Sequence, residues 1–284
     1  MNQWQLGDVK ITRVVESEAP WPGGWLLPNA TAENVQKENW LHPIFADESG
    51  KLRMSIHAYV IESHGKRIVV DTCIGNDKKR ANPAWNELHG PFLGDLAKAG
   101  YAPESIDRVI CTHLHVDHVG WNTIIRDGKW VATFTNARYL VERTEWDYWS
   151  RYEKDNMRDP VEDSVRPIVQ GGLVDMIDPD HRVTDEVWLE PTPGHTPGHM
   201  SVRISSRGRE AVISGDLMHH PIQCAHPEWE SSFDYDMNAA RRTRRDFLER
   251  YADRDVLVFG THFATPSCGK IVTSGGSFRF VAAK

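Results

Sequence analysis

The 284-residue sequence has few cysteines, no long apolar run and no excess of positive charge. No stretch reaches the roughly 18 apolar residues that a membrane span needs, and the first residues lack the pattern of a secretory signal. No CxxC pair occurs, so we expect reduced thiols and neither a disulfide framework nor a cysteine-built zinc site. The four cysteines are Cys73, Cys111, Cys224 and Cys268. We therefore expect a cytoplasmic protein with no membrane partner.

The charge balance argues against nucleic acid as a partner. Thirty-three Lys and Arg against forty Asp and Glu give a formal net charge of -7, which repels phosphate backbones. One dense basic run lies in a stretch of helical spacing, and we interpret it as a solvated helix face. That run comprises Arg241, Arg242, Arg244 and Arg245. The apolar content of 40% and charged content of 26% are typical of a folded globular chain.

Strands dominate the predicted secondary structure. Segments rich in Val and Ile predict strands at 9–15, 56–63, 66–72, 107–113, 137–142, 186–191, 199–205, 209–216 and 255–262. Helical spacing appears at 92–100 and at about 238–251. Strands with helices at intervals favour sheets packed face to face and covered by helices. Without repeats or low-complexity tracts, the simplest organisation is one domain over residues 1–284.

The segment THLHVDHVGWN, at 112–122, follows a predicted strand and predicts a metal site. Residues two apart in an extended chain point the same way, so His113 and His115 can bind one ion. The side chains of Asp117 and His118 are adjacent in sequence and must point in different directions, which suggests a second ion beside the first. Imidazole and carboxylate groups suit zinc and its first-row neighbours. Four ligands cannot complete two coordination shells, and the candidates at other strand ends are His199, Asp216 and His262.

These residues carry a resemblance to a known family. THLHVDHVG resembles the HxHxDH signature of the metallo-β-lactamase superfamily, and the later PGHTPGH, SGD and GTH follow in that superfamily's order. The resemblance covers roughly 56–266. It implies an α+β fold, an αβ/βα sandwich of two mixed β-sheets with helices outside and metals at one edge. It also implies a buried supporting aspartate at Asp71, which would hold the metal loop by hydrogen bonds.

The resemblance further implies a ligand set for two divalent ions, with Zn as the first choice and Mn, Fe or Co as alternatives. The first ion would be held by His113, His115 and His199. The second would be held by Asp117, His118 and His262, with Asp216 bridging the two. A hydroxide between two such ions forms at neutral pH, so hydrolysis is the expected reaction class. Asp117 could pass a proton to the leaving group, and no GxSxG or P-loop motif competes.

The substrate is expected to be a small lactone, ester or phosphotriester. The segment GDLMHHP is similar to sequences in the branch of the superfamily that contains N-acyl-homoserine lactonases and methyl parathion hydrolase. Many of those lactonases carry a tyrosine three residues after the bridging aspartate, where this chain has His219. An imidazole can still donate a hydrogen bond to a developing oxyanion, so His219 is the second catalytic candidate, with His220 the weaker one. The histidine in place of the tyrosine favours assignment to the methyl-parathion-hydrolase-like subgroup over the lactonases.

Other features leave alternatives open. His195 shares a loop with His199 and is expected only to shape or support it. Aromatic side chains gather at 21–28 and 145–152, within two possible lid or interface segments, 17–55 and 143–170. They could line a pocket or form a homodimer contact. The alternative functions are a mononuclear iron enzyme resembling the persulfide dioxygenases and a glutathione thioesterase.

Overall fold

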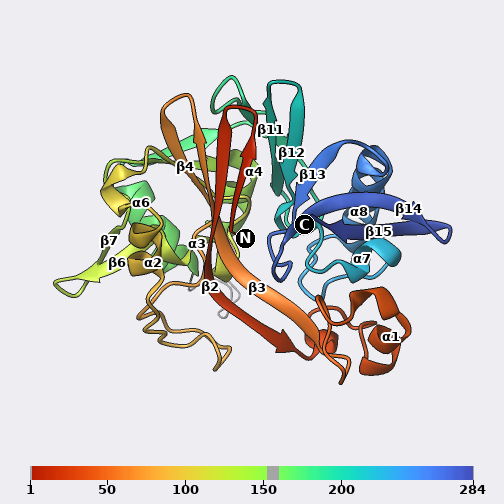
Figure 1. Ribbon diagram of the computed structural model, residues 1–284. Coiled ribbons are helices and arrows are strands. Elements are labelled where there is room, and N and C mark those ends of the chain that lie inside the picture. Colours follow the sequence, from red (N-terminus) through yellow and green to blue (C-terminus); the bar gives the residue numbers. More distant parts are fainter. Residues whose placement is uncertain (1, 152–159, 284) are drawn as a thin grey trace.

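The computed structural model describes residues 2–151 and 160–283. Two mixed β-sheets lie face to face, and helices cover their outer sides (Figure 1). The first sheet has the spatial order β1 (Gln3–Leu6), β2 (Val9–Trp21), β3 (Leu52–Ser63), β4 (Lys66–Val70), β5 (Arg108–Ile110), β8 (Arg138–Glu142) and β9 (Val174–Ile177). The second has the order β10 (Val187–Pro191), β11 (Met200–Ser206), β12 (Arg209–Ile213), β13 (Val256–Phe259), β14 (Cys268–Ser274) and β15 (Ser277–Ala282).

A small third sheet and short helices complete the described chain. Strands β6 (Thr123–Arg126) and β7 (Lys129–Ala132) pair only with each other. The α-helices are α1 (Ala32–Lys37), α2 (Phe92–Lys98), α3 (Val116–Val119), α4 (Arg143–Trp149), α6 (Arg166–Gln170), α7 (Ile222–Ala225) and α8 (Met237–Tyr251). A π-helix at Val161–Val165 precedes α6. This arrangement is the αβ/βα sandwich that the family resemblance implies. No helix among the described residues is long and apolar enough to cross a membrane.

Strand direction decides where the polar loops gather. Strands β4 and β5 are parallel neighbours in the first sheet, and β12 and β13 are parallel neighbours in the second. The carboxyl ends of parallel neighbours lie at one sheet edge, so the loops that follow them meet there. A hairpin turn at Ser63–Lys66 joins β3 and β4, with positive φ angles at His64 and Gly65 (49° and 72°) as a tight turn requires.

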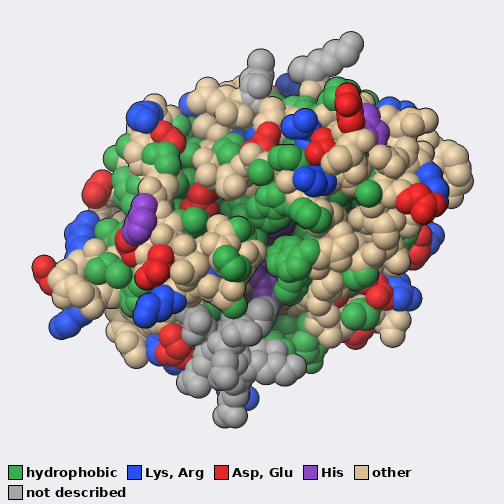
Figure 2. Space-filling model, turned by 90° about the horizontal axis from the view of Figure 1, so that it is seen from below, with side chains coloured by type: hydrophobic (Ala, Val, Ile, Leu, Met, Phe, Trp, Pro, Cys, Tyr) green, Lys and Arg blue, Asp and Glu red, His purple; other side chains and the backbone are tan. Residues whose placement is uncertain are grey.

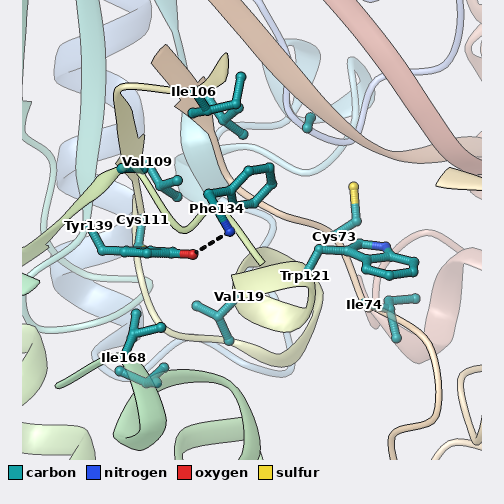
Figure 3. Packing of buried hydrophobic residues seen from close by; sticks show 14 of the residues in the cluster. Cys73, Ile74, Ile106, Val109, Cys111, Val119, Trp121, Phe134, Tyr139 and Ile168 are labelled. Carbon is teal, nitrogen blue, oxygen red and sulfur yellow. Dashed lines mark hydrogen bonds between the residues drawn. The ribbon is translucent and has the colours of Figure 1, made fainter. Parts of the chain in front are cut away.

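The core under the first sheet packs directly behind one of these loops. Figure 3 shows part of it, where the backbone N–H of Phe134 donates to the hydroxyl of Tyr139 over 3.1 Å. Leu114 and Val119 belong to the same apolar cluster, so the segment that carries the histidines is anchored by burial of its apolar residues. All four cysteines are buried.

All nine predicted strands and both predicted helices occur, but several elements were missed. The missed strands are β1, β6, β7, β9, β14 and β15, and the missed α-helices are α1, α3, α4, α6 and α7. One interpretation was wrong. Arg244 does not lie on a solvated face with Arg241, Arg242 and Arg245, because its guanidinium is buried and donates to the carbonyls of Leu217, Pro227 and Trp229.

Candidate metal centre

Five loops bring the candidate side chains together. Asp71 follows β4, the segment 113–118 follows β5, Asp216 follows β12 and His262 follows β13. A fifth loop, between β10 and β11, carries His195. The parallel pairing described above puts the first four loops at one edge of the sandwich.

The carboxylate of Asp216 is the centre of this cluster. Its Oδ2 lies 3.2 Å from Nε2 of His118, 3.2 Å from Nε2 of His262, 3.6 Å from Nε2 of His195 and 3.8 Å from Nε2 of His113. Among the described residues, four groups place their ligand atoms within 4.8 Å of one another. They are His113, His115 and His195; His113, His118 and Asp216; Asp117, His118 and His262; and His195, Asp216 and His219.

Three buried atoms in this cluster have no hydrogen-bond partner among the described residues. They are Nε2 of His113, Oδ1 of Asp216 and Nδ1 of His219. A buried polar atom without a hydrogen-bond partner lowers the stability of the fold, unless a bound ion, ligand or water contacts it in the functional protein. Imidazole nitrogens around carboxylates are the ligands that zinc and similar ions take. The residues therefore fit divalent metal ions.

The outward ring nitrogens of three histidines are held by hydrogen bonds. Nδ1 of His262 lies 3.0 Å from the carbonyl of Ser55, which can only accept, so this nitrogen carries the proton and Nε2 directs a lone pair to the centre. Nδ1 of His195 lies 2.8 Å from Asp234, and Nδ1 of His118 lies 2.9 Å from Asp71. Such partners fix the tautomer and the direction of a metal-binding imidazole.

Asp71 has the surroundings that the resemblance implies. Besides the imidazole of His118, it accepts hydrogen bonds from the backbone N–H and the hydroxyl of Thr112, at 2.8 and 2.9 Å. It is almost completely buried. Its carboxylate therefore fixes the start of the segment that carries the histidines.

His199 does not lie with the candidate ligands, which corrects the expectation from the resemblance. Its Nδ1 donates to the carbonyl of Thr192 over 3.0 Å, so the proton is on Nδ1. Its Nε2 accepts a hydrogen bond from the backbone N–H of Asp216 over 2.8 Å, which occupies the lone pair a metal would need. The loop instead turns His195 toward the centre, with its Nε2 2.9 Å from Nδ1 of His115. His199 thus holds the backbone of Asp216.

A glycine makes this arrangement of His199 possible. A Cβ at Gly215 would lie 2.5 Å from Nε2 of His199, and the φ of Gly215 is +59°. Both the close approach and the backbone conformation favour glycine at this position.

The charges of the cluster depend on one another. Burial raises the pKa of Asp216, but the facing imidazoles of His118, His262 and His219 outweigh it and hold that pKa well below its usual range. Burial lowers the pKa of His118, but the carboxylates of Asp216, Asp71 and Asp117 raise it well above its ordinary value. A positive charge is thus favoured beside Asp216, and a bound cation would displace the proton that His118 carries.

The two histidines after Asp216 have different surroundings. Nε2 of His219 lies 3.2 Å from Oδ2 of Asp216, while its buried Nδ1 has no hydrogen-bond partner. His220 points away, because its Nε2 is bonded to the carbonyl of Phe45 and its Nδ1 accepts from the backbone of Ile222. His219 therefore belongs to the centre, and His220 has a structural role.

A cavity of about 770 Å³ opens over the cluster. Its floor includes His115, Asp117, His195, Asp216, His219 and His262. Its walls include the apolar side chains of Trp21, Trp25, Leu26, Met54, Trp85 and Phe233. In Figure 2 apolar side chains surround a central hollow in which histidine is visible. The N-terminal aromatic segment thus lines the pocket.

The second aromatic segment lies behind the centre. Neither Trp146, Tyr148 nor Trp149 lines the cavity. The Trp149 ring instead packs against His115, with the ring centroids 5.2 Å apart. Part of the expected 143–170 segment, residues 152–159, lies outside the described residues.

Several residues that build the site were not predicted from the sequence. His195 was not expected at the centre, although PGHTPGH contains two histidines. Asp234 and Glu145 carried no recognisable signal, because each reaches the site through contacts with distant parts of the chain. Arg80 and Trp85 line the cavity from a loop without regular structure.

Residues 53–262 match the family model described as the metallo-beta-lactamase superfamily. This match covers most of the chain, and its HxHxDH segment supplies His113, His115, Asp117 and His118 to the cluster. The chain therefore belongs to the metallo-beta-lactamase superfamily.

Individual relatives are similar at modest identity. The N-acyl homoserine lactonase AiiA of Bacillus thuringiensis subsp. kurstaki is 26% identical over 175 residues, which are 57% of this chain and 63% of that protein. The match thus spans somewhat less than two thirds of that relative's length.

Solved structures show the same fold over nearly the whole chain. The hydrolase AbOPH of the beta lactamase superfamily superposes with a TM-score of 0.81 at 24% identity, covering 99% of this chain and 97% of that one. AidC, a dizinc quorum-quenching lactonase in complex with a product, superposes with a TM-score of 0.80 at 21% identity and the same coverage. At these identities the likeness is one of fold.

Proposed function

We propose that this protein is a binuclear metal-dependent hydrolase that opens lactones or cleaves related esters or phosphotriesters. The observation that carries the proposal is the cluster of imidazoles and carboxylates around Asp216, with unpaired buried atoms, on the floor of an apolar cavity. The named function of the lactonase relatives supports the same reaction class.

The proposed ligand set assigns three residues to each ion. His113, His115 and His195 would hold one ion; Asp117, His118 and His262 would hold the other, and Asp216 would contact both. Zinc is the first candidate, since imidazole and carboxylate are its usual ligands, with Mn, Fe or Co as alternatives. Such ions, when bound, would supply a hydroxide nucleophile at neutral pH.

Two residues of the chain would handle the proton and the developing charge. Asp117 lines the cavity, so it could take up the proton that the attacking water releases and pass it to the leaving oxygen. His219 also faces the cavity and can donate a hydrogen bond to an oxyanion. Burial lowers its pKa, so at neutral pH it is an uncharged donor.

The cavity walls favour a substrate with an apolar group next to the bond that is cut. Trp21, Trp25 and Phe233 offer flat apolar surfaces beside the polar floor. An uncharged lactone, aryl ester or phosphotriester meets this requirement.

The cytoplasmic location, the single domain and the homodimer expected from the sequence stay predictions.

The test combines elemental analysis of the untreated protein with a panel of lactones, aryl esters and phosphotriesters. We expect about two metal equivalents, turnover of at least one substrate class, and loss of that turnover on chelation. A metal-replete sample that cleaves none of them would contradict the substrate proposal. One equivalent of iron with oxygen consumption on a thiol persulfide would favour the mononuclear dioxygenase alternative.

A further inference from the structure

Helix α4 carries a buried carboxylate that forms no ion pair with the described residues. Glu145 is 1% exposed. Its Oε1 accepts hydrogen bonds from the backbone N–H of Leu114 over 3.0 Å and from the indole of Trp149 over 2.6 Å. Its Oε2 accepts from the backbone N–H of Gly198 over 2.9 Å. A polar group removed from water is costly unless it is hydrogen-bonded, and these three donors supply the partners that the buried carboxyl group needs.

The two backbone donors lie on the two loops that supply the proposed first ion site. Leu114 lies between His113 and His115, so fixing its N–H fixes the directions of both neighbouring side chains. Gly198 belongs to the loop that turns His195 to the centre. One carboxyl group therefore joins loops that are more than 80 residues apart in the chain, and it does not line the cavity.

Close packing supports the same contact independently of the hydrogen bonds. A Cβ at Gly198 would lie 2.1 Å from Oε2 of Glu142 and 2.6 Å from the backbone nitrogen of Glu145. The start of α4 is thus pressed against this loop, and only glycine leaves room for it. From the same helix, Trp149 packs against the ring of His115.

The second proposed ion site has separate supports. Asp71 holds His118 and the carbonyl of Ser55 holds His262, and neither contact involves α4. A change at Glu145 should therefore affect one ion and spare the other.

We propose that Glu145 is a positioning residue that sets the metal affinity of the site formed by His113, His115 and His195, without touching metal or substrate. This inference rests on the proposed function, since it requires that the centre binds two ions. Outer supports of metal ligands change metal affinity by about 10–100-fold when they are mutated.

The experiment measures zinc binding by the full chain, stripped of metal and titrated in competition with a chromophoric chelator. In Glu145→Gln the amide NH2 must face a backbone N–H, so one loop loses its acceptor. We expect the affinity of one ion to fall about 10–100-fold, with the other within about twofold of the original protein. The matched control is Asp147→Asn, which removes an exposed carboxylate from the same helix and should change neither affinity.

A second variant keeps the test decisive if Glu145→Gln fails to fold. Trp149→Phe removes one donor to Glu145 and retains most of the packing, and we expect a smaller loss at the same ion. Circular dichroism of the metal-free variants separates folding from binding. Unchanged affinities in a folded Glu145→Gln, or in Trp149→Phe where only that variant folds, would overturn the inference. Failure of the original protein to bind zinc would instead count against the proposed function.

Discussion

The floor and the wall of the cavity are held in place by different forces. On the floor, the imidazoles of His118, His195 and His262 are each fixed by a hydrogen bond from the outward nitrogen to a residue distant in the chain. On the wall, Trp25 contacts Trp85 and Phe233 through ring faces and edges, at centroid distances of 5.8 and 5.1 Å, and Trp25 is 45% exposed. Directional bonds define the floor, and non-directional apolar contacts define the wall.

This difference separates the chemistry from the choice of substrate. Buried hydrogen-bonded groups tolerate little change, because each lost partner leaves another group unpaired. Exposed aromatic contacts tolerate more, since a surface substitution leaves no buried polar group behind. Changes on the floor should therefore stop the reaction, whereas changes on the wall should alter which substrates bind.

The largest effect is expected for Asp216→Asn. The variant loses the charge at the centre of the cluster, so ions should bind there more weakly, and we expect turnover to fall by about three orders of magnitude or more. Elemental analysis should give fewer than two equivalents, and the far-ultraviolet circular dichroism should stay unchanged. A variant that keeps both ions and turns over within tenfold of the original protein would contradict the central place of Asp216.

A smaller loss is expected for His219→Phe. The substitution removes one donor aimed at the reacting oxygen, and such losses lower turnover by about 10²–10³. Metal content should not change, because the proposed ligand set does not include His219. Equal rates before and after the substitution, measured with the best substrate of the panel, would remove His219 from the catalytic residues.

The smallest effect is expected on the wall. Trp25→Ala removes part of an apolar surface, and a loss near 1.4 kcal/mol of substrate binding would raise KM about tenfold. The value of kcat should stay within about twofold. Trp188→Ala is the control, because this indole lies outside the cavity. A fall in kcat as large as that expected for His219→Phe would mean that the wall residues also contribute to the chemical step.

Local patterns were predictable from the sequence, and long-range choices were not. Nine of the strands followed from runs of Val and Ile, and the segment 113–118 is a compact signature within one loop. The choice between His195 and His199 was not predictable, since each follows a Pro-Gly pair and only the fold decides which ring turns inward. The resemblance assigned His199, whereas the backbone N–H of Asp216 occupies its free nitrogen.

The residues that hold the site in place through hydrogen bonds were also not predictable from the sequence. Asp234 lies 39 residues from the histidine it contacts, and Glu145 lies 31 residues from Leu114. Arg244 is part of a basic run on a helix, and its burial depends on hydrogen bonds to three carbonyls of the segment between β12 and α8. These roles arise from tertiary contacts, which no local pattern records.

The most direct test of the account is a zinc-soaked crystal of the protein measured at the zinc absorption edge. We predict two anomalous peaks beside the carboxylate of Asp216, with Nε2 of His195 about 2.0–2.1 Å from one of them and His199 bound to neither. A single peak, no peak, or a peak coordinated by His199 in place of His195 would contradict it.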